Sequence, residues 1–241
     1  MRTQIIDFSD RQTPVVFPNE RSNLAQAISE LGLKDRYPAI VLIGGEIDGQ
    51  QAVVTQRAIE AIARAAADMH AVLICGGTDM GIVAQIGQIR WRHGYKFPLI
   101  GVTPEGLVTW PGGPHNTKFL WLGKQRWQLE SHHSHFILVP GSQFGDESPW
   151  IGDVATLLSK GRQSVTILIN GGEVSRKDIR LSLENGRPVI VLSRTGHLAD
   201  ELSRQPVRDK LITVVPAQAE QRIVEAIQAA LSIDEKSKAG V

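Results

Sequence analysis

The sequence has very little cysteine. Cys75 is the only one among 241 residues, so no disulfide can form within the chain. A chain without disulfides is typical of a reducing compartment, and we therefore expect a cytoplasmic protein.

The sequence also lacks the features of membrane and nucleic-acid proteins. No segment approaches the roughly 20 apolar residues that a membrane-spanning helix needs. The start, MRTQIIDFSDRQTP, carries charges early and does not resemble a signal peptide. The formal net charge is only +1, which gives no general attraction to nucleic acid, although a small anion can still bind locally. We expect no membrane span and no nucleic-acid partner.

Several catalytic motifs are missing. The dinucleotide fingerprint Gly-x-Gly-x-x-Gly does not follow the first apolar run, and no phosphate loop or Gly-x-Ser-x-Gly nucleophile turn is present. The tract His132–His135 has poor spacing for a metal site, because in a strand His133 and His135 would share one face and His132 the other. We expect no metal and no resident cofactor, and we interpret Cys75 as a buried strand residue.

What the sequence does contain is an alternation of apolar runs and amphipathic segments. The runs are nearly continuous in Val, Ile and Leu, which is typical of parallel strands covered by helices on both faces. The alternation predicts an α/β fold: a Rossmann-like, doubly wound, mostly parallel sheet of about seven strands flanked by helices. The predicted strands cover residues 39–43, 71–75, 99–102, 135–139, 164–169, 188–192 and 211–215, and the helices cover 51–69, 81–93, 151–159, 175–185 and 217–231.

Two stretches interrupt this alternation. Residues 1–36 contain a possible strand at 14–17 and a helix at 23–31, and we expect them to form a lead-in packed on the main domain, residues 37–232. Residues 103–130 form a long segment with Trp110, Trp121 and Trp127, and segments of this length are usually functional when they are ordered. Residues 233–241 are expected to be a flexible tail.

Glycines follow five of the apolar runs directly or closely. In a parallel sheet these turns lie at one edge, where open α/β sheets bind their ligands. Glycine lets a ligand approach the backbone, and the next helix offers unpaired N–H groups and partial positive charge to a phosphate. The glycines are Gly44, Gly45, Gly76, Gly77, Gly141, Gly171, Gly172 and Gly196.

Polar residues in these turns have two interpretations each. Thr78 or Asp79 either caps the next helix or contributes to the ligand site, where the Thr78 hydroxyl would donate a hydrogen bond to a phosphate. Glu147 or its neighbour Asp146 has a functional interpretation, in which it contacts ribose hydroxyls or acts as a general base. In the structural interpretation both are first-turn carboxylates favoured by the helix dipole. Arg194, which precedes Thr195 and Gly196, either pairs with a phosphate or lies on the surface.

Five blocks of the chain resemble a known family. They read VLICGGTDMG (72–81), FPLIGVTPEGLVTWPG (97–112), HSHFILVPGSQFGDESPW (133–150), VTILINGGEVSRKDI (165–179) and GRPVIVLSRTGHLAD (186–200). They are similar to the prokaryotic relatives of the N-terminal region of TRPM channels, the LSDAT-type group of the SLOG superfamily. Its distant kin are the "lonely guy" phosphoribohydrolases, often labelled lysine decarboxylase-like. The likeness runs from about residue 25 to about residue 201.

The resemblance implies a Rossmann-like fold, binding of an ADP-ribose-like ligand, a sensor role and a homo-oligomer. Carried over by motif, the binding positions are Gly44, Gly45, Gly76, Gly77, Thr78, Gly141, Glu147, Gly171, Gly172, Thr195 and Gly196. The chain departs from the channel relatives at His197, where they often have arginine. It also departs from the phosphoribohydrolase motif Pro-Gly-Gly-x-Gly-Thr-x-x-Glu, because residues 140–147 read PGSQFGDE, without the threonine and with altered spacing.

Three hypotheses follow for the function. The first, which we prefer, is a non-catalytic module that binds a nucleotide-derived, phosphate-bearing small molecule at the carboxyl edge of the sheet. The second is a hydrolase that cleaves the N-glycosidic bond of a nucleotide with Glu147 as acid or base. The third is a scaffold in which the tryptophan segment forms an interface, since exposed aromatics often anchor interfaces; the same tryptophans would otherwise act as a lid that stacks on a base.

Overall fold

The apolar runs form one nine-stranded sheet in the computed structural model, which describes residues 1–34, 36–47, 51–114, 125–160, 163–205 and 209–232. The strand order is β1-β2-β8-β5-β4-β3-β9-β10-β11. Seven of these strands match the predicted runs: β3 (Ala39–Gly44), β4 (Val72–Cys75), β5 (Leu99–Pro104), β8 (His135–Val139), β9 (Ser164–Ile169), β10 (Val189–Ser193) and β11 (Ile212–Pro216). The prediction of an α/β fold with a large, mostly parallel sheet is confirmed.

The other two strands come from the lead-in. β1 (Arg2–Phe8) pairs antiparallel with β2 (Arg11–Phe17), and β2 pairs parallel with β8. The sequence indicated only one short strand here, because the outer strand β1 alternates between exposed and buried residues. The division of the chain at residue 36 stays a prediction, and the predicted tail lies outside the described residues.

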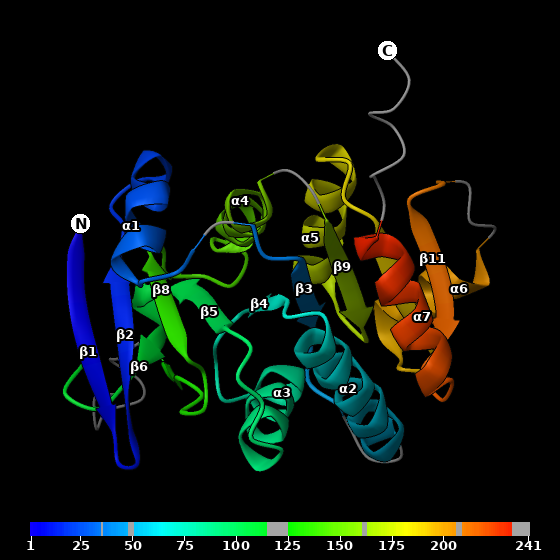
Figure 1. The fold of residues 1–241 in the computed structure, drawn as a ribbon, viewed down its shortest axis with the longest axis horizontal. Coiled ribbons are helices and arrows are strands. Elements are labelled where there is room, and N and C mark those ends of the chain that lie inside the picture. The colour runs from blue at the N-terminus through cyan, green and yellow to red at the C-terminus, as the bar shows by residue number, and fades with distance from the viewer. Residues whose placement is uncertain (35, 48–50, 115–124, 161–162, 206–208, 233–241) are drawn as a thin grey trace.

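Helices cover both faces of the sheet (Figure 1). One core contains side chains of α2 (Gln51–Asp68), α3 (Gly81–Arg92) and α7 (Glu220–Leu231). The other contains side chains of α1 (Leu24–Glu30), α4 (Ser148–Ser159), α5 (Glu173–Glu184) and α6 (His197–Arg204). Neighbouring residues of one strand enter opposite cores, as Ile40 and Val41 of β3 do. This explains why the strand runs are continuously apolar.

A third core lies under the β1–β2 hairpin. It contains Phe17, Trp110 and Leu129, and it includes the short strands β6 (Val108–Thr109) and β7 (Trp127–Gln128), which pair in a separate small sheet. Trp110 is only 6% exposed and packs on Phe17 with ring centroids 5.9 Å apart. The hypothesis that Trp110 is an exposed interface or lid residue is therefore wrong, because its ring is part of a core. Trp121 lies outside the described residues.

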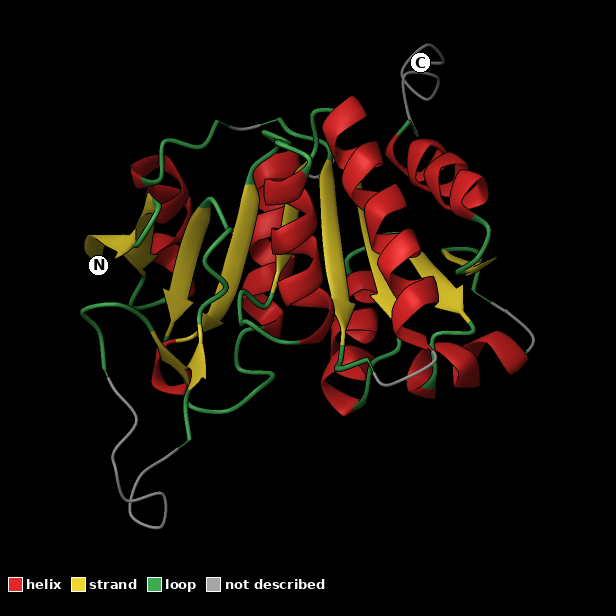
Figure 2. Cartoon of the chain, turned by 90° about the horizontal axis from the view of Figure 1, so that it is seen from below, coloured by secondary structure: helices red, strands yellow, loops and turns green. Residues whose placement is uncertain are grey.

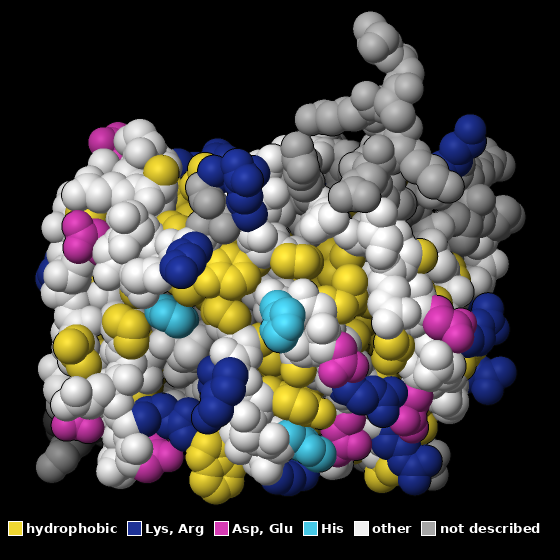
Figure 3. Space-filling view, in the orientation of Figure 1, with side chains coloured by type: hydrophobic (Ala, Val, Ile, Leu, Met, Phe, Trp, Pro, Cys, Tyr) yellow, Lys and Arg dark blue, Asp and Glu magenta, His cyan; other side chains and the backbone are white. Residues whose placement is uncertain are grey.

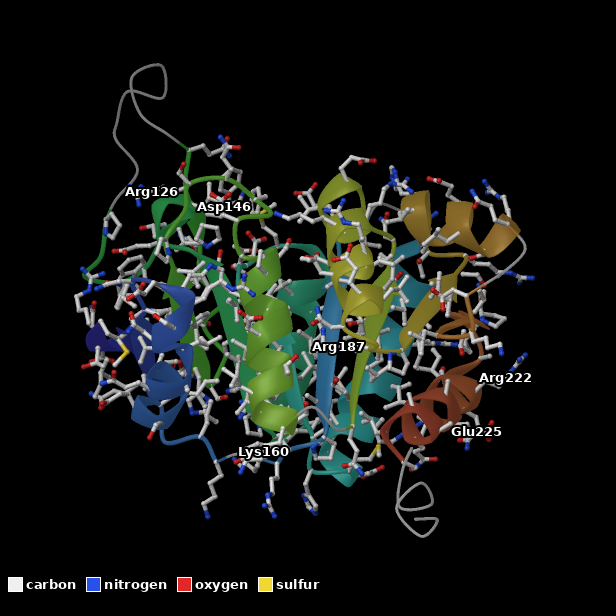
Figure 4. All side chains as sticks on the ribbon, turned by 90° about the horizontal axis from the view of Figure 1, so that it is seen from above. Arg126, Asp146, Lys160, Arg187, Arg222 and Glu225 are labelled. Atoms are coloured by element: carbon white, nitrogen blue, oxygen red, sulfur yellow. The ribbon has the colours of Figure 1, made fainter. Side chains whose placement is uncertain are left out.

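The parallel strands all point to the same edge of the sheet (Figure 2). Asp146, just before α4, and Lys160, just after it, mark the two ends of that helix in Figure 4. The start of α4 thus lies at the edge where the strands end. Among the described residues no helix is long and apolar enough to cross a membrane. On the face drawn in Figure 3, basic and acidic side chains are interspersed.

Candidate functional site

A cavity of about 340 Å³ opens at the carboxyl ends of β3, β4 and β9. Its position follows from the topology: β3 leads into α2 on one face, β9 leads into α5 on the other, and the two strands are neighbours. Such a switch point leaves a crevice between the loops, where open α/β sheets bind ligands. The described residues that line it are Leu42, Ile43, Gly44, Gly45, Glu46, Gly76, Thr78, Met80, Ile82, Val83, Thr103, Phe144, Glu147, Ile151, Gly172, Glu173, Val174, Ser175 and Asp178.

Two of the predicted glycines are not required by steric contacts within the described fold. A Cβ atom added to Gly76 or Gly172 would meet no atom within 4 Å, and neither residue lies in the left-handed backbone region. Gly45 is similar, since its nearest neighbour would be Gly171 N at 3.9 Å. All three line the cavity. The described fold therefore gives neither a steric reason nor a left-handed backbone as the reason for glycine at these three positions.

Other predicted glycines are required by the fold. Gly77 has φ +73°, and its Cβ would lie 2.8 Å from Gly101 Cα in β5. A Cβ on Gly44, which does line the cavity, would overlap the carbonyl oxygen of Ile169. Gly141, Gly171 and Gly196 also have positive φ, and each would bring a Cβ against a nearby side chain. Gly77 and these three lie outside the cavity lining.

Glu147 lies at the entrance to α4 and lines the cavity. The side chain is 6% exposed, and Oε2 accepts a hydrogen bond of 2.8 Å from the backbone N–H of Gly145. Burial raises the pKa of Glu147 to about 7, and the nearby charges of Asp178 and Asp146 act in the same direction. The cavity thus contains a carboxyl group that gains or loses its proton near neutral pH.

Asp178 is a second buried carboxyl that the sequence reasoning missed. It lies on the inner face of α5, lines the cavity and is 9% exposed. Burial raises its pKa to about 6, while the nearby Ser148 hydroxyl, as a hydrogen-bond donor, and the charge of Lys177 act in the opposite direction. A signal was present: the buried face of α5 carries Ser175, Asp178 and Ser182 beside Ile179. Polar residues in an apolar stripe indicate a local function or a specific hydrogen-bond network.

The charge on the cavity wall is entirely negative. Glu46, Glu147, Glu173 and Asp178 are its charged members, and none of the described lining residues is lysine or arginine. The positive potential comes instead from the backbone, because α3, α4 and α5 all begin beside the cavity, near Gly81, Ser148 and Glu173. N–H groups at helix starts suit a phosphate without a basic side chain.

The remaining predicted residues are placed differently. Thr78 lines the cavity, but Asp79 lines a separate cavity of about 320 Å³ with Trp110 and Leu129. Arg194 is exposed, outside the lining, with its backbone N–H donating to Asp200 Oδ1 at 2.5 Å. The Thr195 hydroxyl is used within the fold. It donates to Leu192 O at 2.7 Å and accepts the N–H of Asn170 at 2.8 Å.

The structure therefore gathers Gly44, Gly45, Gly76, Thr78, Glu147 and Gly172 around one cavity, and not the 194–196 turn. Ligand binding by any of these residues stays a prediction. Met80, Phe144 and Val174 are among the apolar residues of the wall. Sequence reasoning missed them because apolar residues near turns carry no distinctive pattern.

The histidine tract belongs to a separate buried network. Glu130 bonds through Oε1 to His132 Nδ1 at 2.5 Å and through Oε2 to His133 Nδ1 at 2.7 Å, while His133 Nε2 lies 3.2 Å from Cys75 Sγ. Burial opposes the charged imidazole, but Cys75 and Glu130 raise the pKa of His133 to about 9.

β8 begins at His135, where the sequence predicts the strand to begin. His132 and His133 precede it in the turn that carries this network, so the alternation of strand faces does not extend to them. Cys75 is buried in β4, as the sequence indicated. Within the described ranges, no three His, Cys, Asp or Glu side chains gather as metal ligands.

Known proteins resemble this chain in sequence and in fold. The profile of the family described as "SLOG in TRPM, prokaryote" matches residues 37–237. The transient receptor potential cation channel subfamily M member 2 of Mus musculus is 26% identical over 149 residues, and that of Rattus norvegicus is 25% identical over 181 residues. These matches cover 55% and 59% of this chain but only 9% and 12% of the channels. The chain thus spans about a tenth of the length of these relatives.

Two solved structures share the fold. The molybdenum cofactor carrier protein of Chlamydomonas reinhardtii superposes with a TM-score of 0.52 at 18% identity, covering 81% of this chain and 99% of that one. The molybdenum cofactor binding protein of Rippkaea orientalis gives 0.54 at 17% identity, covering 81% and 98%. At this level of identity the likeness shows the Rossmann-like fold alone.

Proposed function

We propose, since this chain belongs to the family of prokaryotic SLOG domains related to TRPM channels, that its cavity binds a nucleotide-derived small molecule that carries a phosphate. The observation that carries the proposal is the pair Gly76 and Gly172. An added Cβ would meet no atom within 4 Å at either residue, neither residue has a positive φ, and both border the same cavity at the switch point of the sheet. An open backbone beside helix starts is the arrangement that a phosphate needs.

The cavity offers different chemistry to different parts of such a ligand. The phosphate would bind backbone N–H groups near Gly76 and Gly172, where no Cβ intervenes. The base would contact apolar side chains such as Met80, Val83 and Ile151. The sugar would lie toward the buried carboxyl of Glu147. The ADP-ribose-like character of the ligand rests on the resemblance to the channel region and belongs to this proposal.

A sensor role follows from the same premise. Binding without turnover would report ligand concentration to a partner, and the family likeness suggests that the chain acts as a homo-oligomer in the cytoplasm. The names of the two solved structures with the same fold agree with a small-molecule site, because both names refer to the molybdenum cofactor as cargo or ligand.

One observation favours a hydrolase as the second candidate. Glu147 is a buried carboxyl in the cavity with a pKa of about 7, which suits a general acid or base at neutral pH. Cleavage of an N-glycosidic bond would then release the free base from a nucleoside monophosphate. Release of base by the wild type, lost in Glu147→Gln, would establish this candidate, and release that survives Glu147→Gln would remove the mechanism.

Calorimetric titration tests the binding proposal directly. ADP-ribose, AMP and NAD would be titrated into the full chain, and we expect at least one to bind more tightly than about 1 mM, or roughly 4 kcal/mol. Gly172→Val should weaken this binding, because Gly172 lines the cavity and the branched side chain would restrict access to its backbone. Asp79→Asn is the matched control, since Asp79 borders the other cavity and should leave the affinity unchanged. Weaker binding of all three ligands by the wild type would contradict the proposal.

A further inference from the structure

We propose that Glu130 is a positioning residue for the ligand: acting through His133, it holds the turn after β4 in the conformation that binds the phosphate. The inference rests on the proposed function and adds to it a residue that does not touch the ligand. Glu130 is 1% exposed and lies outside the cavity lining. The turn that it holds supplies Gly76 and Thr78 to the cavity wall.

The backbone around Glu130 is bonded directly to this turn. The N–H of Glu130 donates to the carbonyl oxygen of Gly77 at 3.0 Å, and the N–H of Asp79 donates to the carbonyl oxygen of Gln128 at 2.8 Å. These two bonds lie on either side of Thr78, a residue of the cavity wall. The position of the chain at Glu130 therefore helps to determine where the turn lies.

The carboxylate of Glu130 reaches the same turn by a second route, through a histidine ring. Oε2 lies 2.7 Å from His133 Nδ1, and His133 Nε2 lies 3.2 Å from Cys75 Sγ. Cys75 is the last residue of β4 and directly precedes Gly76. The carboxylate also accepts the backbone N–H of His132 at 3.0 Å. One buried carboxylate thus connects both ends of the turn.

The network is enclosed by the fold. A Cβ added to Gly87 in α3 would overlap the carboxylate of Glu130. The ring of His133, which is fully buried, stacks on Phe136 of β8 with ring centroids 5.3 Å apart. Because close-packed interiors transmit displacement, a shift of the carboxylate or the ring should move the turn as well.

The charge of His133 decides how many bonds this network makes. Burial opposes the charge, but Cys75 and Glu130 raise the pKa of His133 to about 9. The charged ring donates from both nitrogens, to Glu130 Oε2 and to Cys75 Sγ. A neutral ring has one N–H, so loss of the proton removes one of the two donors that join the carboxylate to β4.

Other charged or titratable side chains surround the network on the neighbouring elements. Aspartate and arginine ordinarily titrate well outside the range from about pH 8 to about pH 9.5. The pKa of His135 is lowered to about 4 by burial and by the charge of Arg90. The surrounding groups are Asp10, Arg11, Asp79, Arg90, His132 and His135.

The test measures how the affinity for AMP depends on pH. AMP would be titrated calorimetrically into the full chain at about pH 8 and about pH 9.5, where the phosphate, with a second pKa of about 6, and Glu147, with a pKa of about 7, have lost their protons. If the protein with neutral His133 binds AMP about 10-fold more weakly, the affinity of the wild type should fall about 3-fold between these pH values.

Two variants separate positioning from stability. Glu130→Gln removes the charge that stabilises the imidazolium, so we expect about 10-fold weaker AMP binding at pH 8 and no further decline toward pH 9.5. Thr166→Val is the control, because it removes a buried hydrogen bond of 2.8 Å to the Ser182 hydroxyl, outside both the network and the cavity lining. It should lower the Tm without changing the affinity or its pH dependence.

Each outcome decides a separate point. A wild-type affinity that stays constant between these pH values would overturn the inference, even if Glu130→Gln does not fold. A lower Tm with unchanged affinity in Glu130→Gln would assign Glu130 a purely structural role and overturn it too. Weaker binding with the decline of the wild type would show that Glu130 does not act through His133.

The proposed function is tested separately by the wild type at pH 8. If AMP does not bind but ADP-ribose or NAD does, the same comparison with that nucleotide decides the inference. If none of the three binds, the proposed function itself has failed, and this inference fails with it.

Discussion

Replacing Gly76 with alanine tests whether this glycine is needed for ligand binding or for the stability of the fold. The added methyl group meets no atom within 4 Å, and Gly76 lies outside the left-handed region. Alanine also reduces the conformational freedom of the unfolded chain, so we expect the free energy of unfolding to rise by about 0.4–1 kcal/mol. For a chain of this size that corresponds to an increase in Tm of about 1–4 °C.

Gly76 lines the cavity, so we expect the added methyl group to hold a phosphate away from the backbone. Loss of one hydrogen bond to a charged group costs about 1.5–3 kcal/mol, which is about a 10- to 100-fold loss in affinity. Differential scanning fluorimetry would give the Tm, and calorimetry with the best of the three nucleotide ligands would give Kd. A variant that is more stable and binds less tightly is the expected result.

The matched control is the adjacent Gly77→Ala. Gly77 has φ +73°, and its Cβ would lie 2.8 Å from Gly101 Cα. The left-handed backbone and the overlap together should lower the free energy of unfolding by about 2–5 kcal/mol. A drop in Tm for Gly76→Ala similar to that for Gly77→Ala would refute the reasoning, because Gly76 would then serve the fold. Unchanged ligand affinity in Gly76→Ala would refute the placement of the phosphate.

Three further predictions concern buried ionisable groups. The pKa of Glu147 is raised from 4.5 to about 7, so the folded state holds the proton more tightly, and the free energy of unfolding should fall by about 3 kcal/mol as pH rises through that window. In urea unfolding, Glu147→Gln should lack this decrease. An identical pH profile of the variant and the wild type would show that Glu147 does not cause the decrease. The pKa of His133 is raised from 6.5 to about 9, so the stabilising contribution of His133 is complete below pH 6.5 and is lost as pH rises to 9. The free energy of unfolding of Glu130→Gln should decline less over that range. A decline equal to that of the wild type would show that Glu130 does not stabilise the charged imidazole of His133. Gly87→Ala would place a Cβ in the Glu130 carboxylate and should lower the Tm. Gly152→Ala is the control: its Cβ would lie 3.9 Å from the nearest atom, so the Tm should stay unchanged or rise. Equal changes in Tm for the two variants would contradict the role of the Glu130 network in stability.

Much of the fold could be predicted because its signals are local. Continuous apolar runs such as 164–169 predict strands buried on both faces, and these strands lie in the interior of the sheet with cores on either side. The turns after them contain glycine, so the edge that carries the cavity was also predictable. The outer strand β1 was missed because one side of it faces solvent, which interrupts the apolar pattern.

The composition of the site depended on the tertiary structure. Gly76 and Gly77 are adjacent and identical in the sequence, yet one borders the cavity and the other packs on Gly101, because successive backbone positions face different neighbours. Asp178 lies inside α5, six residues after the Gly171–Gly172 turn, and the packing of α5 beside α4 brings it to the cavity with Glu147. The turn at 194–196 fits a phosphate motif as well as the others do, but it follows β10, one strand further along the sheet, and its threonine is used by the fold. The sequence by itself determined which residue types follow each strand, because that is a property of neighbouring residues. Strand order and helix packing decided which of these residues line the same cavity, because both depend on contacts between distant parts of the chain.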